Sequence, residues 1–190
     1  MLFRSPIVAE DKESLLAGLQ QLTPLSRYRR FFSPIHTLST TMLAQLTELD
    51  YHDRFAWVAL ALDAPGGRGV GVARYARCTT DPHVAEVAIA VADDHHRRGI
   101  GTLLLEVLAL TAREHGIERL TALVLADNEP MTTLLRDHGA SLHMEASAGA
   151  WRAEVPVPAD PSDMRNTALY RLLRLAARGQ IGQWTRPADD

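Results

Sequence analysis

A short segment between a buried strand and a helix carries the residue types best suited to chemistry in this 190-residue chain. Residues 97–101 hold two arginines, then Gly99 and Gly101, and they lie between an apolar run (Val84–Ala92) and a helical pattern that continues to about His115. The first N–H groups of a helix lack intrahelical partners and carry partial positive charge. Glycine lets an anion approach the main chain, and arginine adds full charge. The segment therefore predicts a site for a phosphate or pyrophosphate.

Two known phosphate-binding patterns do not match this segment. A nucleoside-triphosphate loop needs Gly-Lys followed by Ser or Thr, and residues 95–102 contain no lysine. A dinucleotide-binding fingerprint needs a third glycine where this chain has Leu104. We therefore expect a different class of anion-binding site.

Glu86 is the candidate catalytic residue, because it is a lone carboxylate in the apolar run before the loop. Burial destabilises a charged carboxylate and makes it a stronger base, so we expect Glu86 to act as a general base. Two other interpretations stay open: the side chain faces solvent on the open side of the sheet, or it pairs with an arginine. Asn128, after a second apolar run (Leu120–Leu125), is suited to cap the next helix.

The elements that would position these residues alternate between strand and helix patterns. The N-terminal quarter is mainly helical, residues 23–26 break it, and the periodicity then changes. Strands are predicted at 2–8, 55–62, 70–78, 84–92, 120–125, 141–145 and 151–157, and helices at 13–22, 39–49, 102–115, 128–139 and 163–178. This order predicts an α/β fold with at least one parallel crossover. Residues 1–158 form the predicted domain, and 159–190 a helical extension that could cover the sheet edge, form a homodimer contact or close the acceptor side.

Composition excludes several classes of protein. No run approaches the roughly 18 consecutive apolar residues of a membrane helix, and the first residues lack the apolar core of a signal peptide. The formal net charge of −3 argues against nonspecific nucleic-acid binding. The single cysteine, Cys78, excludes an internal disulfide, and no histidine spacing indicates a metal site. We expect a cytoplasmic protein with no nucleic-acid, membrane or metal partner and with Cys78 as a small core residue.

The loop and its setting resemble the GNAT superfamily of acetyltransferases. His96–Gly101 aligns with the acyl-CoA signature (Gln/Arg)-x-x-Gly-x-(Gly/Ala), except that His96 replaces the usual Gln or Arg. The likeness extends from about Leu2 to Val157 and implies a twisted mixed sheet flanked by helices, with acetyl-CoA (CoA) as co-substrate. It implies that acetyl-CoA is held by the preceding strand, the loop and the next helix cap: Ile89, Ala90, Val91, Ala92, His96, Arg97, Arg98, Gly99, Ile100, Gly101, Thr102 and Asn128.

A narrower likeness is to the bacterial Pat-type protein lysine acetyltransferases. It rests on segments 26–34, 46–54, 71–75, 85–93 and 124–131. It implies direct transfer in a ternary complex to a protein lysine, with Glu86 as the base. Many GNAT members carry a tyrosine four residues before the glycine that ends the last helix, as a proton donor to the thiolate. This chain has Leu135 there, so no general acid is named.

Two rival functions stay open. The first is acetylation of a small cationic amine in an acidic pocket formed by Asp50, Asp53 and Asp81. The second is a CoA-binding regulatory domain without activity. The basic and aromatic run at 27–32 is another open feature: packing of Tyr28, Phe31 and Phe32 under the sheet is favoured over lining an acceptor groove.

Overall fold

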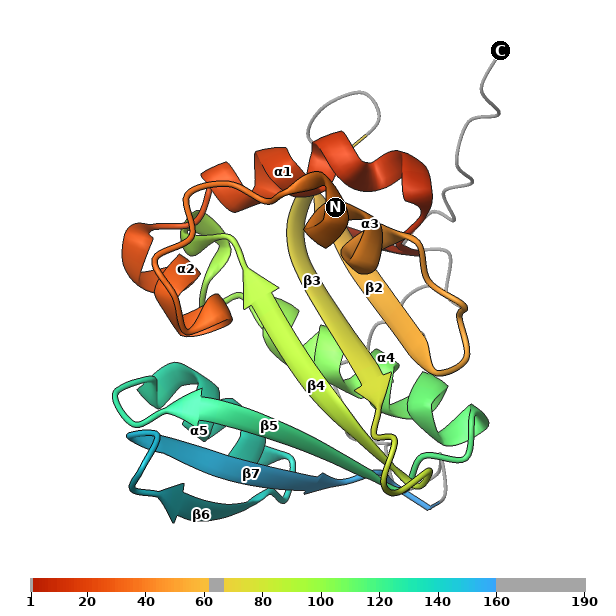
Figure 1. Ribbon diagram of the computed structural model, residues 1–190, viewed down its shortest axis with the longest axis vertical. Coiled ribbons are helices and arrows are strands. Elements are labelled where there is room, and N and C mark those ends of the chain that lie inside the picture. Colours follow the sequence, from red (N-terminus) through yellow and green to blue (C-terminus); the bar gives the residue numbers. More distant parts are fainter. Residues whose placement is uncertain (1, 62–66, 160–190) are drawn as a thin grey trace.

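The computed structural model describes residues 2–61 and 67–159 and contains one seven-stranded sheet in the order β1-β2-β3-β4-β5-β7-β6 (Figure 1). The strands are β1 (Leu2–Pro6), β2 (Arg54–Ala61), β3 (Arg68–Arg77), β4 (Val84–Val91), β5 (Arg119–Leu125), β6 (Ser141–Glu145) and β7 (Ala150–Pro156). Neighbours pair antiparallel except β4 and β5, which pair parallel. A parallel pair needs a crossover, and the helix between β4 and β5 supplies it. The predicted mixed α/β order is confirmed.

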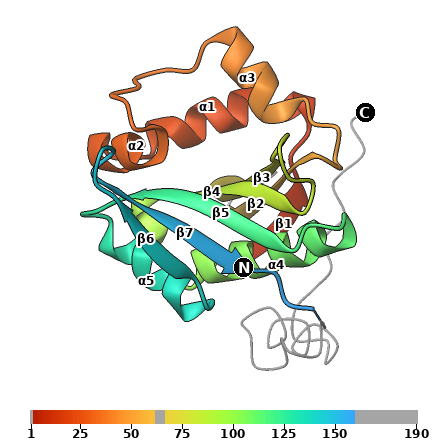
Figure 2. The same cartoon turned by 60° about the horizontal axis from the view of Figure 1, so that its bottom comes forward.

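Helices cover both faces of the sheet (Figure 2). Helices α1 (Lys12–Gln20), α2 (Pro24–Phe31) and α3 (Thr40–Thr47) lie on one face, and α4 (Ile100–Glu114) and α5 (Glu129–Asp137) on the other. The helix predicted over 163–178 lies outside the described residues. Among the described residues, no helix is both long and apolar enough to cross a membrane.

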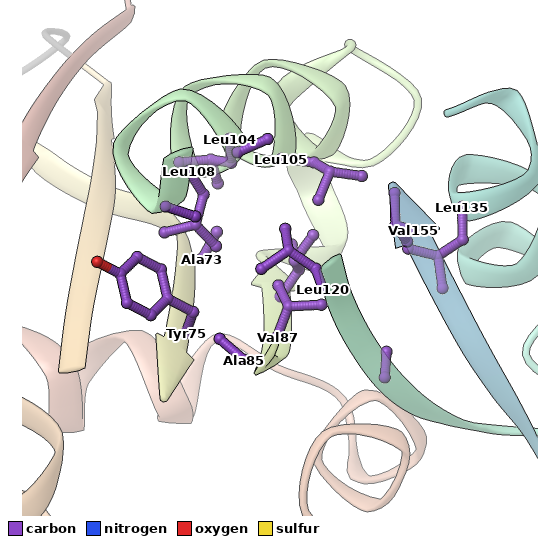
Figure 3. Packing of buried hydrophobic residues seen from close by; sticks show 14 of the residues in the cluster. Ala73, Tyr75, Ala85, Val87, Leu104, Leu105, Leu108, Leu120, Leu135 and Val155 are labelled. Atoms are coloured by element: carbon purple, nitrogen blue, oxygen red, sulfur yellow. The ribbon is translucent and has the colours of Figure 1, made fainter. Parts of the chain in front are cut away.

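The main core lies between α4, α5 and the sheet (Figure 3). Leu104, Leu105 and Leu108 of α4 are almost fully buried against alternate residues of the strands, including Val87 of β4. Because successive strand residues point to opposite faces, Glu86, Ala88 and Ala90 lie on the face that α1, α2 and α3 cover. One strand thus contributes to the core and to the opposite, functional face.

Helix α2 begins where the sequence analysis predicted a break. Thr23 is its N-cap and accepts a hydrogen bond from the N–H of Ser26 at 3.2 Å, while Pro24 occupies the first helical turn. Threonine followed by proline is a start signal for a helix as well as a stop for the preceding one. The basic and aromatic run is therefore a helix beside the sheet.

Candidate active site

Strands β4 and β5 diverge toward their carboxyl ends (Figure 1), and the opening is the stretch of the sheet where their backbones no longer pair. Their pairing covers Val84–Arg119, Ala85–Leu120 and Glu86–Thr121 and stops there. The N–H of Ala92 donates to Val70 of β3, so alternation turns the main-chain groups of Val87, Ile89 and Val91 away from β3 and toward the opening. An extended ligand arm that enters the opening would meet free strand edges.

This direction separates the predicted strand residues into two kinds. Ile89 and Val91 present main-chain groups to the opening, whereas the N–H groups of Ala90 and Ala92 point to β3. Ala90 and Ala92, together with Val91, line a mainly apolar cavity of about 210 Å³ beneath α1. The two kinds of residue therefore differ in the direction of their main-chain groups, while Val91 also reaches the cavity.

The predicted anion-binding loop lies at the end of the opening, at the start of α4. Gly99 is the N-cap of α4 with φ of 77°, a conformation that favours glycine, and a Cβ there would meet no atom within 4 Å. Arg97 and Arg98 are exposed, and Thr102 is half-buried in the first helical turn. The side chain of Ile100 is buried in the core, so its predicted contact with a ligand would be made by its main-chain N–H at the start of α4. The loop offers orphan helix N–H groups, two arginines and open space for a phosphate.

The adjacent histidines point to different partners. His95 is buried and its Nδ1 lies 2.7 Å from Asp94 Oδ1, whereas the exposed His96 places Nε2 2.9 Å from the carbonyl oxygen of Val91. Among the residues that the structure describes, no group of three His, Cys, Asp or Glu side chains is placed to hold a metal ion.

Glu86 lies at a cavity of about 290 Å³ on the face covered by α2 and α3. The cavity is lined by Arg30, Phe31, Met42, Gln45, Leu46, Arg74, Ala76, Glu86 and Ala88. The expectation that Glu86 is buried is wrong: its side chain is exposed, because this stretch of the face is only partly covered by helices. The solvent-facing interpretation is the correct one, and a carboxylate there is accessible to an acceptor amine or a water.

The end of β5 is tied to α2 beside the opening. Asn128 caps α5, where its Oδ1 accepts from the N–H of Met131 at 3.4 Å. Next to it, Arg29 of α2 donates to the main-chain oxygen of Asp127 at 2.8 Å. At the other end of α2, Asp93, just after β4, accepts from the N–H of Thr23 at 2.8 Å. Helix α2 therefore contacts the segments that follow both diverging strands.

Several other predicted features lie elsewhere or are packed differently. Leu135 is completely buried in the core. Asp50 caps the loop before β2, where its carboxylate accepts from the N–H groups of His52, Asp53 and Arg54. Burial would raise the pKa of Asp50, but these hydrogen bonds outweigh it and hold the pKa well below the usual value. Neither Asp50 nor its neighbour Asp53 lines the cavities described above. The same holds for Asp81, which pairs with Arg119 in the turn before β4. These three aspartates therefore do not contribute acidic groups to either of the two cavities.

The aromatic residues of α2 and the single cysteine also differ from expectation. Tyr28 and Phe32 are exposed, so the prediction that they pack under the sheet is wrong, while Phe31 lines both cavities. An eight-residue helix presents only one side to the sheet, and Phe31 is on that side. Cys78 follows the end of β3 and is only partly buried, so it is not a core residue.

Sequence reasoning missed two residues of the site, Arg30 and Arg74. Both line the cavity of Glu86. For Arg74 a signal was available, because an arginine within an apolar strand is as unusual as Glu86 in its own strand. For Arg30 there was none, since all six residues of the run at 27–32 are cationic or aromatic and the pattern does not reveal which one faces the sheet.

Comparison with known proteins assigns the family. The model of the acetyltransferase (GNAT) family matches residues 25–140. Acetyltransferase Pat of Mycolicibacterium smegmatis is 34% identical over 153 residues, which are 80% of this chain and 45% of that protein; the chain thus spans less than half of it. An acetyltransferase of Pseudomonas aeruginosa is 33% identical over 68% of this chain and 69% of its own length.

Solved structures agree with this assignment. The GNAT domain of the Pat protein of S. lividans is 34% identical, with a TM-score of 0.74 over 80% of this chain and 89% of that domain. A putative acetyltransferase of Salmonella typhimurium, solved with acetyl-CoA, shares the fold with a TM-score of 0.65 and 14% identity over 84% of this chain and 96% of its own. The fold implied by the loop resemblance is confirmed, and the chain belongs to the GNAT family of acetyltransferases.

Proposed function

We propose that this domain transfers the acetyl group of acetyl-CoA to a primary amine, and that the amine is the side chain of a protein lysine. The observation that supports it best is the combination of an anion-binding loop, a free strand edge and an accessible carboxylate along one strand, β4. The likeness to two Pat proteins supports the choice of a lysine acceptor.

The residues present fit acetyl-CoA. The N–H groups at the start of α4, the open space over Gly99 and the charges of Arg97 and Arg98 suit a pyrophosphate. The main-chain groups of Ile89 and the N–H of Val91, whose carbonyl oxygen is bonded to His96, suit the amide groups of a pantetheine arm. Acetyl-CoA supplies an acetyl group activated as a thioester.

Glu86 is the proposed base. A lysine amine has a pKa of about 10.4 and must lose a proton before it attacks. The exposed Glu86 carboxylate would accept that proton, directly or through a water. The amine nitrogen then forms the new amide bond while the carbon–sulfur bond breaks and the thiolate leaves with the electron pair. The N–H of Ile89 or Val91, which faces the opening, would donate to the carbonyl oxygen as it becomes negative.

Transfer of label from acetyl-CoA in a cell extract tests this function. The extract is divided into protein and small-molecule fractions, with Glu86→Gln as the control enzyme. We expect label in discrete protein bands that depends on Glu86. Label in the small-molecule fraction alone would replace the protein acceptor by a small amine. Binding of acetyl-CoA without any labelled product would favour a regulatory domain instead.

A further inference from the structure

Two arginines flank the proposed base on the acceptor side of the sheet. Arg74 lies opposite Ala88, and Glu86 lies opposite Ala76, so Arg74 and Glu86 are diagonal neighbours on the same face. Arg30 reaches the same cavity from α2. The space in which an acceptor amine would meet Glu86 therefore contains two cations and one anion.

Arg30 is half-buried, and the Glu86 carboxylate is the anion that acts on its charge. Its guanidinium makes no hydrogen bond or ion pair to the described residues, and its Cζ lies 4.8 Å from the centre of the Phe31 ring. Burial first, then repulsion by Arg74, lowers the pKa of Arg30 to about 10, and Glu86 opposes this shift. The side chain stays charged at neutral pH. Arg30 and Arg74 share one carboxylate, so a bound anion would supply the second counter-charge and improve their environment.

Neighbouring elements do not neutralise the two arginines. The residues of α3 that line the cavity, Met42, Gln45 and Leu46, carry no charge, and Arg74 donates to the main-chain oxygen of Gln45 at 3.3 Å. Two further cations on the sheet are already paired: Arg54 of β2 with Asp50 and Arg152 of β7 with Glu145. The charged residues that line the cavity, with Glu86 included, therefore carry a net charge of +1.

We propose that the acceptor carries a carboxylate close to its amine, with the amine directed to Glu86 and the carboxylate held by Arg30 and Arg74. Arginine binds carboxylates with two parallel hydrogen bonds, which fixes orientation as well as charge. In a protein acceptor this chemistry is a lysine next to an aspartate or glutamate; in a small molecule it is a free amino acid. A polyamine or an aminoglycoside would place further cations against both arginines. The inference rests on the proposed acetyl transfer.

Paired peptides test the acceptor chemistry. Each pair contains one lysine and differs only in its neighbour, glutamate or glutamine, and acetylation is followed by mass spectrometry. We expect kcat/KM to be about 10- to 100-fold higher for the glutamate peptide, because a charged hydrogen-bonded pair is worth roughly 1.5–3 kcal/mol. Equal transfer to both peptides would overturn the inference and leave the proposed function intact. No transfer to any peptide or free amino acid would overturn the proposed function itself.

Variants identify the arginines as the source of the preference. Arg30→Gln and Arg74→Gln should each reduce the ratio between the two peptides toward one, and Arg74→Glu should invert it in favour of a peptide with arginine beside the lysine. Arg136→Gln, an exposed residue on α5 across the sheet, is the matched control and should keep the wild-type ratio. Thermal melting shows whether each variant folds, and the Arg74 variants remain informative if Arg30→Gln does not. An unchanged ratio in folded Arg30 and Arg74 variants would contradict the assignment. Acetylation of free amino acids but of no peptide would support recognition of a carboxylate by the arginines and would contradict a protein acceptor.

Discussion

The imidazole Nε2 of His96 lies 2.9 Å from the main-chain oxygen of Val91, so the first residue of the loop is bonded to the last residue of β4. The carbonyl can only accept, which requires a hydrogen on Nε2. The residues usual at this position of the signature, glutamine and arginine, also carry side-chain N–H donors. His96 therefore keeps a side-chain N–H donor at the position where the signature has glutamine or arginine.

Removal of this bond should weaken cofactor binding. His96→Ala frees the end of β4, and we expect acetyl-CoA affinity to fall about 2- to 10-fold, the value of one hydrogen bond of 0.5–1.5 kcal/mol. His96→Gln should retain most of the affinity because it keeps a donor. Isothermal titration calorimetry measures both, with the exposed His143→Ala on β6 as control. Wild-type affinity in His96→Ala would show that the bond has no role in binding.

Glu86→Gln should abolish most of the turnover without affecting the cofactor. Loss of a general base lowers kcat/KM by about 10²- to 10⁴-fold, whereas the dissociation constant of acetyl-CoA should not change. Glu154 is a matched control, since the pairing aligns Glu86, Thr121 and Glu154 in one row across the sheet. Glu154→Gln should keep its activity. Equal losses in both variants would point to a general effect of surface charge.

Two substitutions separate the capping role of Asn128 from cofactor binding. Asn128→Ala removes the cap of α5 and should lower the free energy of unfolding by about 1 kcal/mol. Asn128→Asp keeps an oxygen that accepts from Met131 but loses the amide donor. We expect Asn128→Asp to melt like the wild type and to bind acetyl-CoA less tightly. Unchanged affinity in the aspartate variant would leave capping as the whole role.

The two loop glycines should respond differently to alanine. Gly99 has a φ of 77°, so Gly99→Ala should destabilise the fold by about 1–2 kcal/mol through backbone strain. Gly101 is helical, and a Cβ there would meet Leu134 Cδ2, the mobile end of a side chain, at 3.3 Å. Gly101→Ala should therefore be nearly neutral, because alanine also gains about 1 kcal/mol in helix propensity. Urea denaturation compares the two, and a greater loss in Gly101→Ala would contradict this order.

The pair between α4 and α5 should make stability depend on pH. Glu106 is buried, and its Oε1, 3.7 Å from Nε2 of His138, raises the pKa of His138 above 6.5. A raised pKa in the folded state means that the stabilisation is complete below pH 6.5 and is lost as the pH rises through the folded value.

Denaturation at several pH values measures the fall in the free energy of unfolding as the pH rises, and Glu106→Gln should remove this fall. His115, whose pKa is lowered first by burial, acts in the opposite direction. His138→Gln is therefore the control: the pH dependence that remains in it belongs to His115 and other groups. If Glu106→Gln and the wild type show the same slope above pH 6.5, the pair does not contribute.

The sequence predicts the regular elements well and the functional face poorly, for a physical reason. The strand that carries Glu86 and the glycine loop are local patterns, and the predicted bounds of 84–92 agree with Val84–Val91. Which residues face Glu86 depends on strand register and on the side of α2 that meets the sheet. Neither is local, so Arg30 remained hidden among its neighbours, and the solvent-facing position of Glu86 was one of three open interpretations that the sequence could not separate.

Helix α2 connects the two halves of the opening described above. One end is bonded to Asp93 after β4, and Arg29 near the other end is bonded to Asp127 after β5. Arg30 and Phe31, which follow Arg29, line the acceptor cavity. A ligand that changes the separation of these strand ends would also shift the walls of that cavity. The two binding equilibria then share a coupling free energy. The acceptor must therefore change the affinity for acetyl-CoA by the same factor by which acetyl-CoA changes the affinity for the acceptor.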